Sequence, residues 1–482
     1  MTTRLRRVRP ARIVGGMAAV AVLAALPGVA KAGAGPSARR IGPTATPIQH
    51  LVVIFGENIS FDHYFGTYPK AANTSGQPFT TAHPVHVSNL ADTPGQGGFG
   101  TLVNNNPNRD ANGFRVNPRR LDPANINDVL TCDQSHNYNA EQKAFDGGAM
   151  DKFATTLGTA SGTNGAGQPC QASDVMNYYD GNTTTAMWNY AQHYALSDNS
   201  FGTTFGPSAP GAINLISGNT GTVGTMINGA DVNGDTVANG TGGSSVLEDP
   251  QPLYDDCSTR DAVSMTGANV GDNLNAAGLS WGWFQGGFRP TTTFAAAAPP
   301  GQPTATFIPD QFKNSNLPRP PGASYQSLCN AVHPVGAALG GTGNYGNKDD
   351  YIPHHEPFQY YQSTANPHHL TPASLATIGT DSQTVTAGVA QFDTANHQYD
   401  ISDFDALVGA ISHGYLPPSR LPAVSFLKAS GYQDAHPGYS DPIDEQQFVV
   451  NEINALQHTP DWATTAVVVA YDDSDGWYDH VY

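Results

Sequence analysis

The sequence predicts an α/β fold with a mainly parallel sheet flanked by helices, and three kinds of segment lead to this prediction. Residues 50–55 and 465–470 are continuous apolar, β-rich runs, typical of strands covered on both faces in a parallel sheet. Residues 279–284 and 422–427 have the composition of two further strands. Residues 441–456 combine an acidic start with apolar residues at helical spacing, which predicts a helix. Strand, helix and strand in this order form a βαβ unit.

The start of the chain has the pattern of a secretory signal peptide. Five arginines between residues 4 and 12 precede the apolar run 13–30, and the small-residue site Ala30-Lys31-Ala32 follows. A membrane anchor is the alternative, but glycine and proline interrupt the run, which is also short for a span. We therefore expect removal of residues 1–32 and a secreted, periplasmic or cell-envelope protein. The pair Arg6-Arg7 permits the twin-arginine route.

The remaining chain is expected to form a flexible Gly/Pro/Ser leader, residues 33–46, and one domain, residues 47–482. Three stretches rich in Gly, Thr, Asn, Ala and Pro predict long loop insertions, at residues 156–172, 218–246 and 286–324. No later apolar run is long enough to cross a bilayer.

The composition argues against a nucleic-acid partner. The chain has 22 Lys and Arg against 40 Asp and Glu. Because six of the basic residues lie in residues 1–32, the mature chain has 16 basic against 40 acidic residues, a net charge of −24. Such a protein repels polyanions at long range.

The cysteines predict disulfides. An exported chain with an even number of cysteines commonly pairs them, and two bonds are expected here. Their pairing stays open, and free buried thiols are the alternative. The four residues concerned are Cys132, Cys170, Cys257 and Cys329.

Oxygen-rich side chains follow the two strongest predicted strands. Glu57 and Asn58 come directly after the first, and Asp472 and Asp473 come shortly after the last. Because ligands gather beyond the carboxyl ends of parallel strands, we expect these two pairs to meet at one edge of the sheet. Oxygen ligands suit a hard divalent cation. Ordinary turn formation by Asp and Asn is the alternative.

A serine lies at the start of another predicted helix. Pro210 suits the first turn of a helix that runs to Ser217, and Gly218 ends it. Ser208 is then expected just before the helix N-terminus, where free backbone N–H groups favour an anion such as phosphate. Ser208 is either a nucleophile or only the cap of its helix.

Three blocks of the chain match motifs of a known family. Residues 57–66 read ENISFDHYFG, residues 205–210 read FGPSAP, and residues 472–481 read DDSDGWYDHV. They resemble the ENRSFDHYFG, GP[ST]xP and DE-x-DGFFDHV motifs of the bacterial phosphoesterase family that contains secreted phospholipases C and AcpA-type acid phosphatases. The blocks occur in the family's order and span nearly the whole mature chain.

The resemblance implies an alkaline-phosphatase-like fold with one divalent metal ion between the blocks. Oxygen ligands permit calcium, magnesium, manganese or zinc. The resemblance implies that Glu57, Asn58, Asp472 and Asp473 bind the metal and that Ser208 is both a ligand and the nucleophile. It also implies that four histidines surround the phosphate, one of them protonating the leaving group: His136, His354, His355 and His436. Three others, His193, His397 and His458, are assigned to the surface.

The implied activity is hydrolysis of phosphate esters through a phosphoserine, as in phospholipase C. A zwitterionic phospholipid suits the acidic protein better than an anionic one, and transient contact with a membrane surface is expected. Gly211-Ala212 replace the Asn-Arg that phospholipases C usually show, so an acid phosphatase acting on monoesters is the alternative. Members normally continue beyond the last block, so the C-terminal part of the fold is expected to be missing after Tyr482. A catalytically silent secreted binding protein is therefore a second alternative, and the oligomeric state stays open.

Overall fold

The computed structural model describes residues 44–72, 87–158, 162–199, 202–290, 331–339, 345–387 and 389–481. All of them belong to one of the two units of the chain, Ala38–Tyr482. The predicted signal peptide and most of the leader lie outside the described residues, so both stay predictions. None of the helices in the described ranges is long and apolar enough to cross a membrane.

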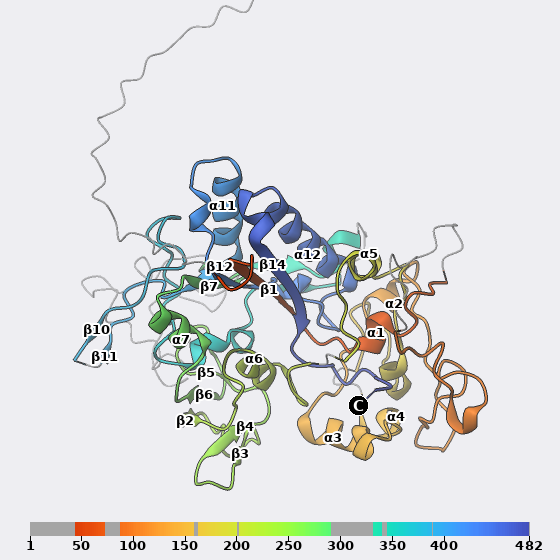
Figure 1. Ribbon diagram of the computed structural model, residues 1–482. Coiled ribbons are helices and arrows are strands. Elements are labelled where there is room, and N and C mark those ends of the chain that lie inside the picture. Colours follow the sequence, from red (N-terminus) through yellow and green to blue (C-terminus); the bar gives the residue numbers. More distant parts are fainter. Residues whose placement is uncertain are drawn as a thin grey trace, which may run out of the picture. The chain divides into compact units, whose positions relative to one another are not determined.

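A five-stranded sheet lies at the centre of the described chain (Figure 1). Its order is β12-β7-β13-β1-β14, and every pairing is parallel. The predicted α/β fold is confirmed, and four of these strands were predicted from the sequence; β12 is too short to show a pattern. The strands are β1 (His50–Gly56), β7 (Trp281–Gln285), β12 (Gln398–Asp400), β13 (Val424–Lys428) and β14 (Thr465–Tyr471).

The longest helix of the described chain is the one predicted at residues 441–456. It begins after Asp441, whose side chain accepts hydrogen bonds from the first-turn N–H groups of Ile443 and Asp444. The α-helices of the described chain are α1 (Phe61–Phe65), α2 (Ile126–Val129), α3 (Tyr138–Phe145), α4 (Phe153–Thr156), α5 (Thr185–His193), α6 (Ser208–Ser217), α7 (Val270–Ala277), α11 (Ile401–Ser412) and α12 (Pro442–Gln457).

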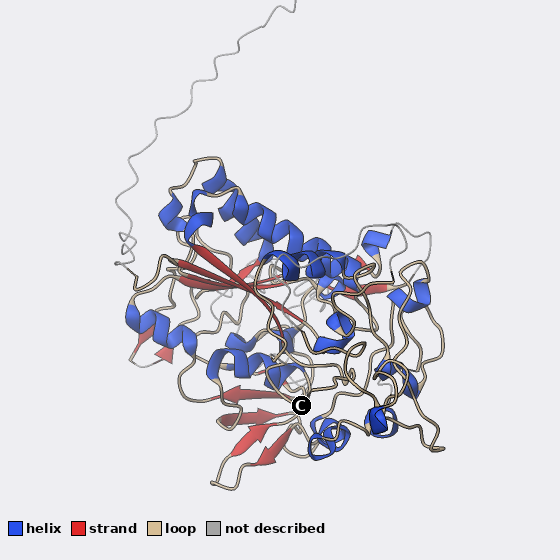
Figure 2. Ribbon diagram, turned by 45° about the vertical axis from the view of Figure 1, so that its right-hand side comes forward, coloured by secondary structure: helices blue, strands red, loops and turns tan. Residues whose placement is uncertain are grey.

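Helices cover both faces of the central sheet (Figure 2). Because successive side chains of a strand point to opposite faces, β1 contributes to two apolar clusters. Val52 and Ile54 pack in one cluster with α11 and α12, and Val53 and Phe55 pack in another with α6. This layering fixes the start of α6 near the carboxyl ends of the strands.

β14 differs from its prediction as a strand covered on both faces. It lies at the end of the strand order, with only β1 beside it among the described strands. Its side chains are half-buried, and Val468 is 45% exposed. An apolar run predicts that a segment forms a strand, but it does not show whether that strand lies inside the sheet or at its edge.

Residues 218–246 were predicted as a long loop, and the structure shows short strands there instead. β2 (Val223–Ile227) pairs with β6 (Ala262–Met265), which also pairs with β5 (Gln251–Pro252), and β3 (Thr236–Ala238) pairs with β4 (Ser244–Val246). Strands this short cannot display an alternating pattern among glycines. The other described hairpins are β8 (Val332–Pro334) with β9 (Asn347–Asp349), and β10 (Val385–Thr386) with β11 (Val389–Ala390).

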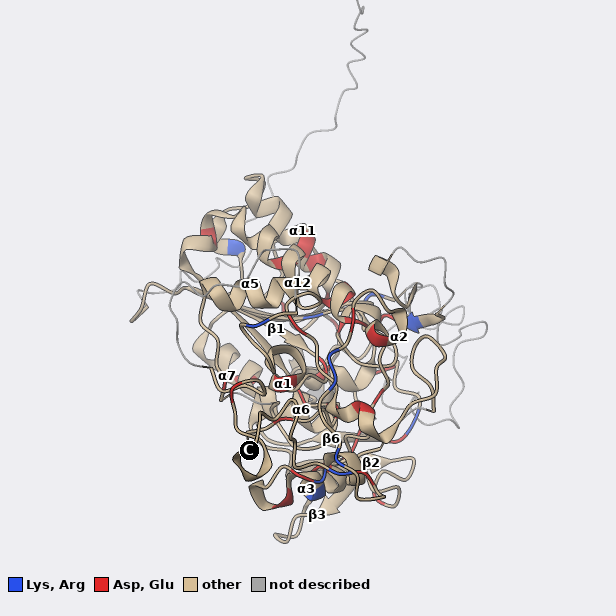
Figure 3. Ribbon diagram, turned by 90° about the vertical axis from the view of Figure 1, so that its right-hand side faces the viewer, with Lys and Arg blue, Asp and Glu red and all other residues tan. Residues whose placement is uncertain are grey.

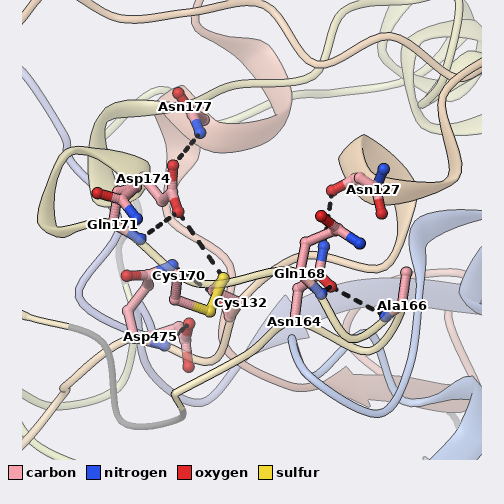
Figure 4. Close-up of a disulfide and its surroundings, with 11 residues drawn as sticks. Asn127, Cys132, Asn164, Ala166, Gln168, Cys170, Gln171, Asp174, Asn177 and Asp475 are labelled. Atoms are coloured by element: carbon pink, nitrogen blue, oxygen red, sulfur yellow. Dashed lines mark hydrogen bonds between the residues drawn. A yellow bond between two sulfur atoms is a disulfide. The ribbon is translucent and has the colours of Figure 1, made fainter.

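A disulfide joins Cys132 and Cys170, with Cα atoms 6.0 Å apart (Figure 4). The backbone N–H of nearby Gln134 donates to Asp475 Oδ2 at 3.0 Å. The disulfide therefore anchors a segment that contacts the last sequence block. Cys257 is also disulfide-bonded. Cys329 lies outside the described residues.

Candidate active site

The two oxygen-rich pairs meet at one edge of the sheet. β1 and β14 stay in register to their last residues, so the chain leaves both strands at the same level. The backbone N–H of Asn58 donates to Asp472 Oδ1 at 3.0 Å. The side chains of Glu57 and Asp473 are buried beside them. Acidic positions outnumber basic ones along the described ribbon (Figure 3), and Glu57, Asp472 and Asp473 are among the buried acidic residues.

Ser208 lies within this cluster. Its hydroxyl donates to Glu57 Oε2 at 2.8 Å, and its Oγ lies 3.4 Å from Asn58 Oδ1 and 3.3 Å from Asp473 Oδ2. Ser208 is the first residue of α6, with Pro207 at the cap position, so its predicted place before the helix was wrong by one residue. Pro207 has no side chain that could cap the helix, and the first-turn N–H of Ala209 donates instead to Asp249 Oδ1 at 2.8 Å. The hydroxyl therefore contacts the cluster rather than the helix backbone.

Helix α6 lies close to the loop that follows β14, and a glycine permits this approach. A Cβ atom at Gly211 would lie 3.0 Å from the Asp472 carbonyl oxygen and 3.1 Å from its Cβ. At Gly202 a Cβ atom would lie 2.7 Å from the Cα of Asp473. The replacement of Asn by Gly211 noted in the sequence thus coincides with tight packing between the serine helix and the carboxylate loop.

The predicted ligand set has the donors that a divalent cation requires. All of its donor atoms are oxygens, and Asp472 Oδ2 is buried without a hydrogen-bond partner. Burial raises the pKa of Glu57 well above its ordinary value, and the neighbouring charge of Asp472 raises it further. Burial and Asp472 also raise the pKa of Asp473. A cation bound here would offset this crowding of carboxylates.

Three tighter groups of potential ligands occur among the described residues, each with its atoms within 4.8 Å of one another. The carboxylates of Glu57, Asp472 and Asp473 do not form so close a group. The Ser208 hydroxyl contacts both Glu57 and Asp473, so its oxygen is a further potential ligand beside these carboxylates. The tighter groups are His136, His436 and Asp475; Asp255, Cys257 and His369; and Asp62, Asp479 and His480.

Lys428 is a site residue that the sequence prediction missed. It ends β13, is 1% exposed, and forms an ion pair with Glu57 Oε1. Burial alone would lower its pKa, but the charges of Glu57 and Asp472 raise it above its ordinary value. The rule that ligands gather at strand ends could have found it, because Lys428 directly follows the predicted strand 422–427.

His354 and His355 lie on a short 3₁₀ turn, Pro353–His355, and His355 contacts Glu57 Oε1, whereas Ser208 contacts Oε2. His355 Nδ1 is 3.2 Å from Glu57 Oε1 and 3.8 Å from Oδ2 of Asp434, another residue that was not predicted. His354 Nδ1 and His355 Nε2 are buried without hydrogen-bond partners. Burial lowers the pKa of both rings well below the ordinary value, which favours neutral imidazoles.

His136 and His436 form a second pair, with ring centres 6.0 Å apart. His136 Nδ1 lies 2.8 Å from the Gln134 carbonyl oxygen and 3.2 Å from Asp475 Oδ1. Burial alone would lower the pKa of His136, but the charges of Asp473 and Asp475 raise it well above the ordinary value. Burial lowers the pKa of His436, and the neighbouring His136 lowers it further. The four histidines therefore divide into one that favours the charged form and three that favour the neutral form.

Asp475 connects these groups, although it was not predicted. Its Oδ1 accepts a hydrogen bond from Asn58 Nδ2 at 3.1 Å and faces His136. Its own backbone has φ 53°, a left-handed conformation that Asp tolerates better than most residues. Its signal was its position as the third acidic residue of the last block.

The remaining histidines divide between surface and interior. His193 and His458 are exposed, as expected. His397 is buried and stacks on Trp281 with ring centres 4.5 Å apart, so its assignment to the surface was wrong. Isolated histidines carry no sequence pattern that distinguishes a buried ring from an exposed one.

Comparison with known proteins decides the family. The model of the phosphoesterase family matches residues 48–482. The chain belongs to the phosphoesterase family. The predicted family is confirmed, and it agrees with the predicted enzyme class of phosphoric ester hydrolases. Members of the phosphoesterase family are typically metal-dependent.

Curated relatives of this phosphoesterase are phospholipases C. The chain is 22% identical over 480 residues to the non-hemolytic phospholipase C of Burkholderia pseudomallei (strain K96243), covering 98% of this chain and 50% of the relative. It is 38% identical over 64 residues to the non-hemolytic phospholipase C of Pseudomonas aeruginosa, covering 13% of this chain and 9% of that protein. It is 35% identical over 88 residues to the non-specific phospholipase C6 of Arabidopsis thaliana, covering 18% and 16%. The chain thus spans about half the length of the first of these relatives.

Proposed function

We propose that this phosphoesterase is a secreted, metal-dependent enzyme of the phospholipase C type that uses Ser208 as its nucleophile. The observation that carries the proposal is the set of contacts of the Ser208 hydroxyl with Glu57, Asn58 and Asp473. The hydroxyl donates to Glu57, so a carboxylate that can accept its proton lies within hydrogen-bond reach. The surrounding carboxylates oppose a negative charge on Oγ, so this arrangement suits a nucleophile only with a cation bound beside it.

Glu57, Asn58, Asp472, Asp473 and Ser208 are the residues that would hold one divalent metal ion. A bound cation lowers the pKa of an adjacent hydroxyl and offsets negative charge on phosphoryl oxygens. The unpartnered Asp472 Oδ2 supports this assignment. Metal analysis of the purified protein would identify the ion.

In the first step, Ser208 Oγ attacks phosphorus and forms a phosphoserine while the bond from phosphorus to the alcohol oxygen breaks. Glu57 Oε2, which accepts the Ser208 hydrogen bond at 2.8 Å, is placed to take the hydroxyl proton. His136 favours its protonated form and donates a proton to the departing alcohol. In the second step, neutral His136 takes a proton from the attacking water. Ser208 then leaves with the proton held by Glu57.

The neutral histidines position the phosphoryl group. His354 Nδ1 is a buried polar atom without a partner, and as an N–H group it would donate a hydrogen bond to a phosphoryl oxygen. Neutral His355 has its proton on Nδ1, which faces Glu57 Oε1 at 3.2 Å, so this ring orients the carboxylate beside the phosphoryl group. His436 stacks on Tyr439 with ring centres 4.3 Å apart, which fixes its ring beside His136.

The phospholipase C names of the relatives favour a diester substrate. One observation favours the second candidate, an acid phosphatase that cleaves monoesters. Gly211 stands where phospholipases C usually show Asn, and the packing against Asp472 leaves no space for that side chain without movement of α6.

Hydrolysis assays on a monoester and a diester separate these candidates. We expect p-nitrophenylphosphorylcholine to be cleaved faster than p-nitrophenyl phosphate, and a chelator to abolish both activities. Ser208→Ala should lower kcat by about 10³-fold or more because the nucleophile is lost. Ser217→Ala is the matched control, since Ser217 ends the same helix and its hydroxyl bonds backbone carbonyls.

Each alternative has its own outcome. Cleavage of the monoester alone would favour the phosphatase. Unchanged rates in Ser208→Ala would remove Ser208 from the mechanism. Absence of turnover in a folded, metal-loaded sample would favour a catalytically silent binding protein.

A further inference from the structure

An apolar pocket of about 430 Å³ lies beside the candidate active site. Its walls include five aromatic side chains, those of Phe61, Phe145, Phe153, Phe205 and Trp477. No Lys, Arg or His lines it among the described residues. Its volume falls within the range of small-molecule sites, and its lining disfavours an anionic ligand.

The pocket shares its wall with the site. Ser60 lines the pocket two residues after Asn58, Phe205 three residues before Ser208, and Ser474 directly after Asp473. Each of the three segments that carry the proposed ligands therefore passes from the site to the pocket wall.

Glu141 holds this shared wall together. Its carboxylate accepts hydrogen bonds from the Gly206 N–H at 2.5 Å and from the Ser474 hydroxyl at 2.6 Å. Because both of its oxygens have partners, Glu141 joins the segments of Gly206 and Ser474 without presenting an unpaired charge to the pocket. Phe205 is 42% exposed, and its ring lies 5.6 Å from the ring of Phe145, centre to centre.

We infer that this pocket binds the hydrocarbon part of the alcohol that leaves from the phosphate ester. The inference rests on the proposed function, because it requires phosphorus at Ser208 while the alcohol extends past Phe205. The phosphoryl group lies on the polar side of the wall and the hydrocarbon on the aromatic side. The substrate class is then a phosphodiester whose alcohol carries an alkyl or acyl chain.

A chain-length series tests the inference in the metal-loaded enzyme. Monomeric butyl, hexyl and octyl phosphorylcholines share one headgroup and differ only in the leaving alcohol. We expect kcat/KM to rise about three- to fourfold for each methylene that enters the pocket. Phe205→Ala and Phe145→Ala should flatten this dependence. Phe114→Ala is the control, because Phe114 is 71% exposed and does not line the pocket.

A binding measurement separates failure of the pocket from failure of the catalytic proposal. Calorimetric titration of Ser208→Ala with octyl phosphorylcholine and with phosphorylcholine should show tighter binding of the octyl ester, and Phe205→Ala should remove the difference. Hydrolysis of the whole series without chain-length dependence would overturn the inference and leave the function standing. Chain-dependent binding without any turnover in the wild type would keep the apolar site and overturn the function.

The source of the chain is decided by one further substrate. Monomeric dihexanoyl phosphatidylcholine places two chains on a glycerol. A kcat/KM above that of hexyl phosphorylcholine would support a phospholipid, and an equal or lower value would support a soluble alkyl ester.

Discussion

The two ends of strand β1 differ in how their polar groups are satisfied. At the beginning of the strand, a pocket of about 660 Å³ is lined by His50, Arg420 and Asp461, among others. His50 Nδ1 lies 2.9 Å from the Pro422 carbonyl oxygen and its Nε2 lies 3.7 Å from Asp461. Of the residues that line this pocket, Asp461 alone has a buried side-chain atom without a hydrogen bond.

At the far end, Glu57, Asp472 and Asp473 crowd around Ser208, and buried atoms of His354, His355 and Asp472 lack partners. The larger pocket thus lies where the polar groups are mostly paired. Uncompensated buried charge, rather than cavity size, distinguishes the end at which chemistry is proposed.

Removal of the buried Lys428 ammonium group at the far end should have the largest effect on stability. Lys428→Met leaves Glu57 without its ion pair, so we expect a loss of about 3–5 kcal/mol in the free energy of unfolding with chelator present. The loss should be smaller at pH 5 than at pH 8, because Glu57 can take up a proton. Added divalent metal should restore part of it.

Arg420→Met is the matched change at the other end of the strand. Arg420 donates one hydrogen bond to the Ala376 carbonyl. We expect the substitution to lower the free energy of unfolding by about 1 kcal/mol. Equal losses for the two variants in urea unfolding would remove the contrast between the ends.

A buried carboxyl group away from both ends should give an intermediate effect. Burial, together with the charge of Asp405, raises the pKa of Glu452 on α12 to about 9. The folded state therefore holds a proton that the unfolded state releases, and this contribution to stability declines as pH rises from about 4.5 to about 9.

Glu452→Gln should therefore flatten the decline and stabilise the protein by about 1–3 kcal/mol at pH 9. Thermal unfolding between pH 5 and pH 9 measures this. A wild type whose stability rises over that interval while the variant's does not would contradict the expected sign.

The smallest effect is expected from Asp461→Asn, at the beginning of β1. The substitution keeps the shape of a side chain that makes a long contact of 3.7 Å with His50. We expect a change in stability below about 1 kcal/mol and hydrolysis within twofold of the wild type. A large loss of activity would show that both ends of the strand take part in the reaction.

Local sequence patterns predicted the elements that hold the site better than the contacts within it. β1 and the helix ending at Gly218 were recognisable because apolar periodicity and a glycine stop are local signals. The convergence of Glu57 with Asp472 followed from the strand-end rule for parallel sheets. The burial of their side chains agrees with that expectation.

Lys428 and Asp434 were missed for a different reason. Each acts through a partner distant in sequence, and a single lysine at a strand end looks like an ordinary solvated residue. Lys428 lies 371 residues from Glu57, so the strand-end rule could have placed it at this edge, but its pairing with Glu57 depends on the register of β13 beside β1. His397 illustrates the same limit, because its burial depends on the stacking of Trp281 from another strand.

The parallel register of β1 has a consequence for how the polypeptide is made. Both of its neighbours, β13 and β14, come from the last part of the described chain, and Asn58 lies 414 residues from Asp472. At about 5–20 residues per second, a ribosome needs roughly 20–80 s between these two points. Until β13 is made, late in that interval, β1 has neither of the strands that it pairs with in the finished protein, so nascent chains should depend on protection from aggregation until translation is almost complete.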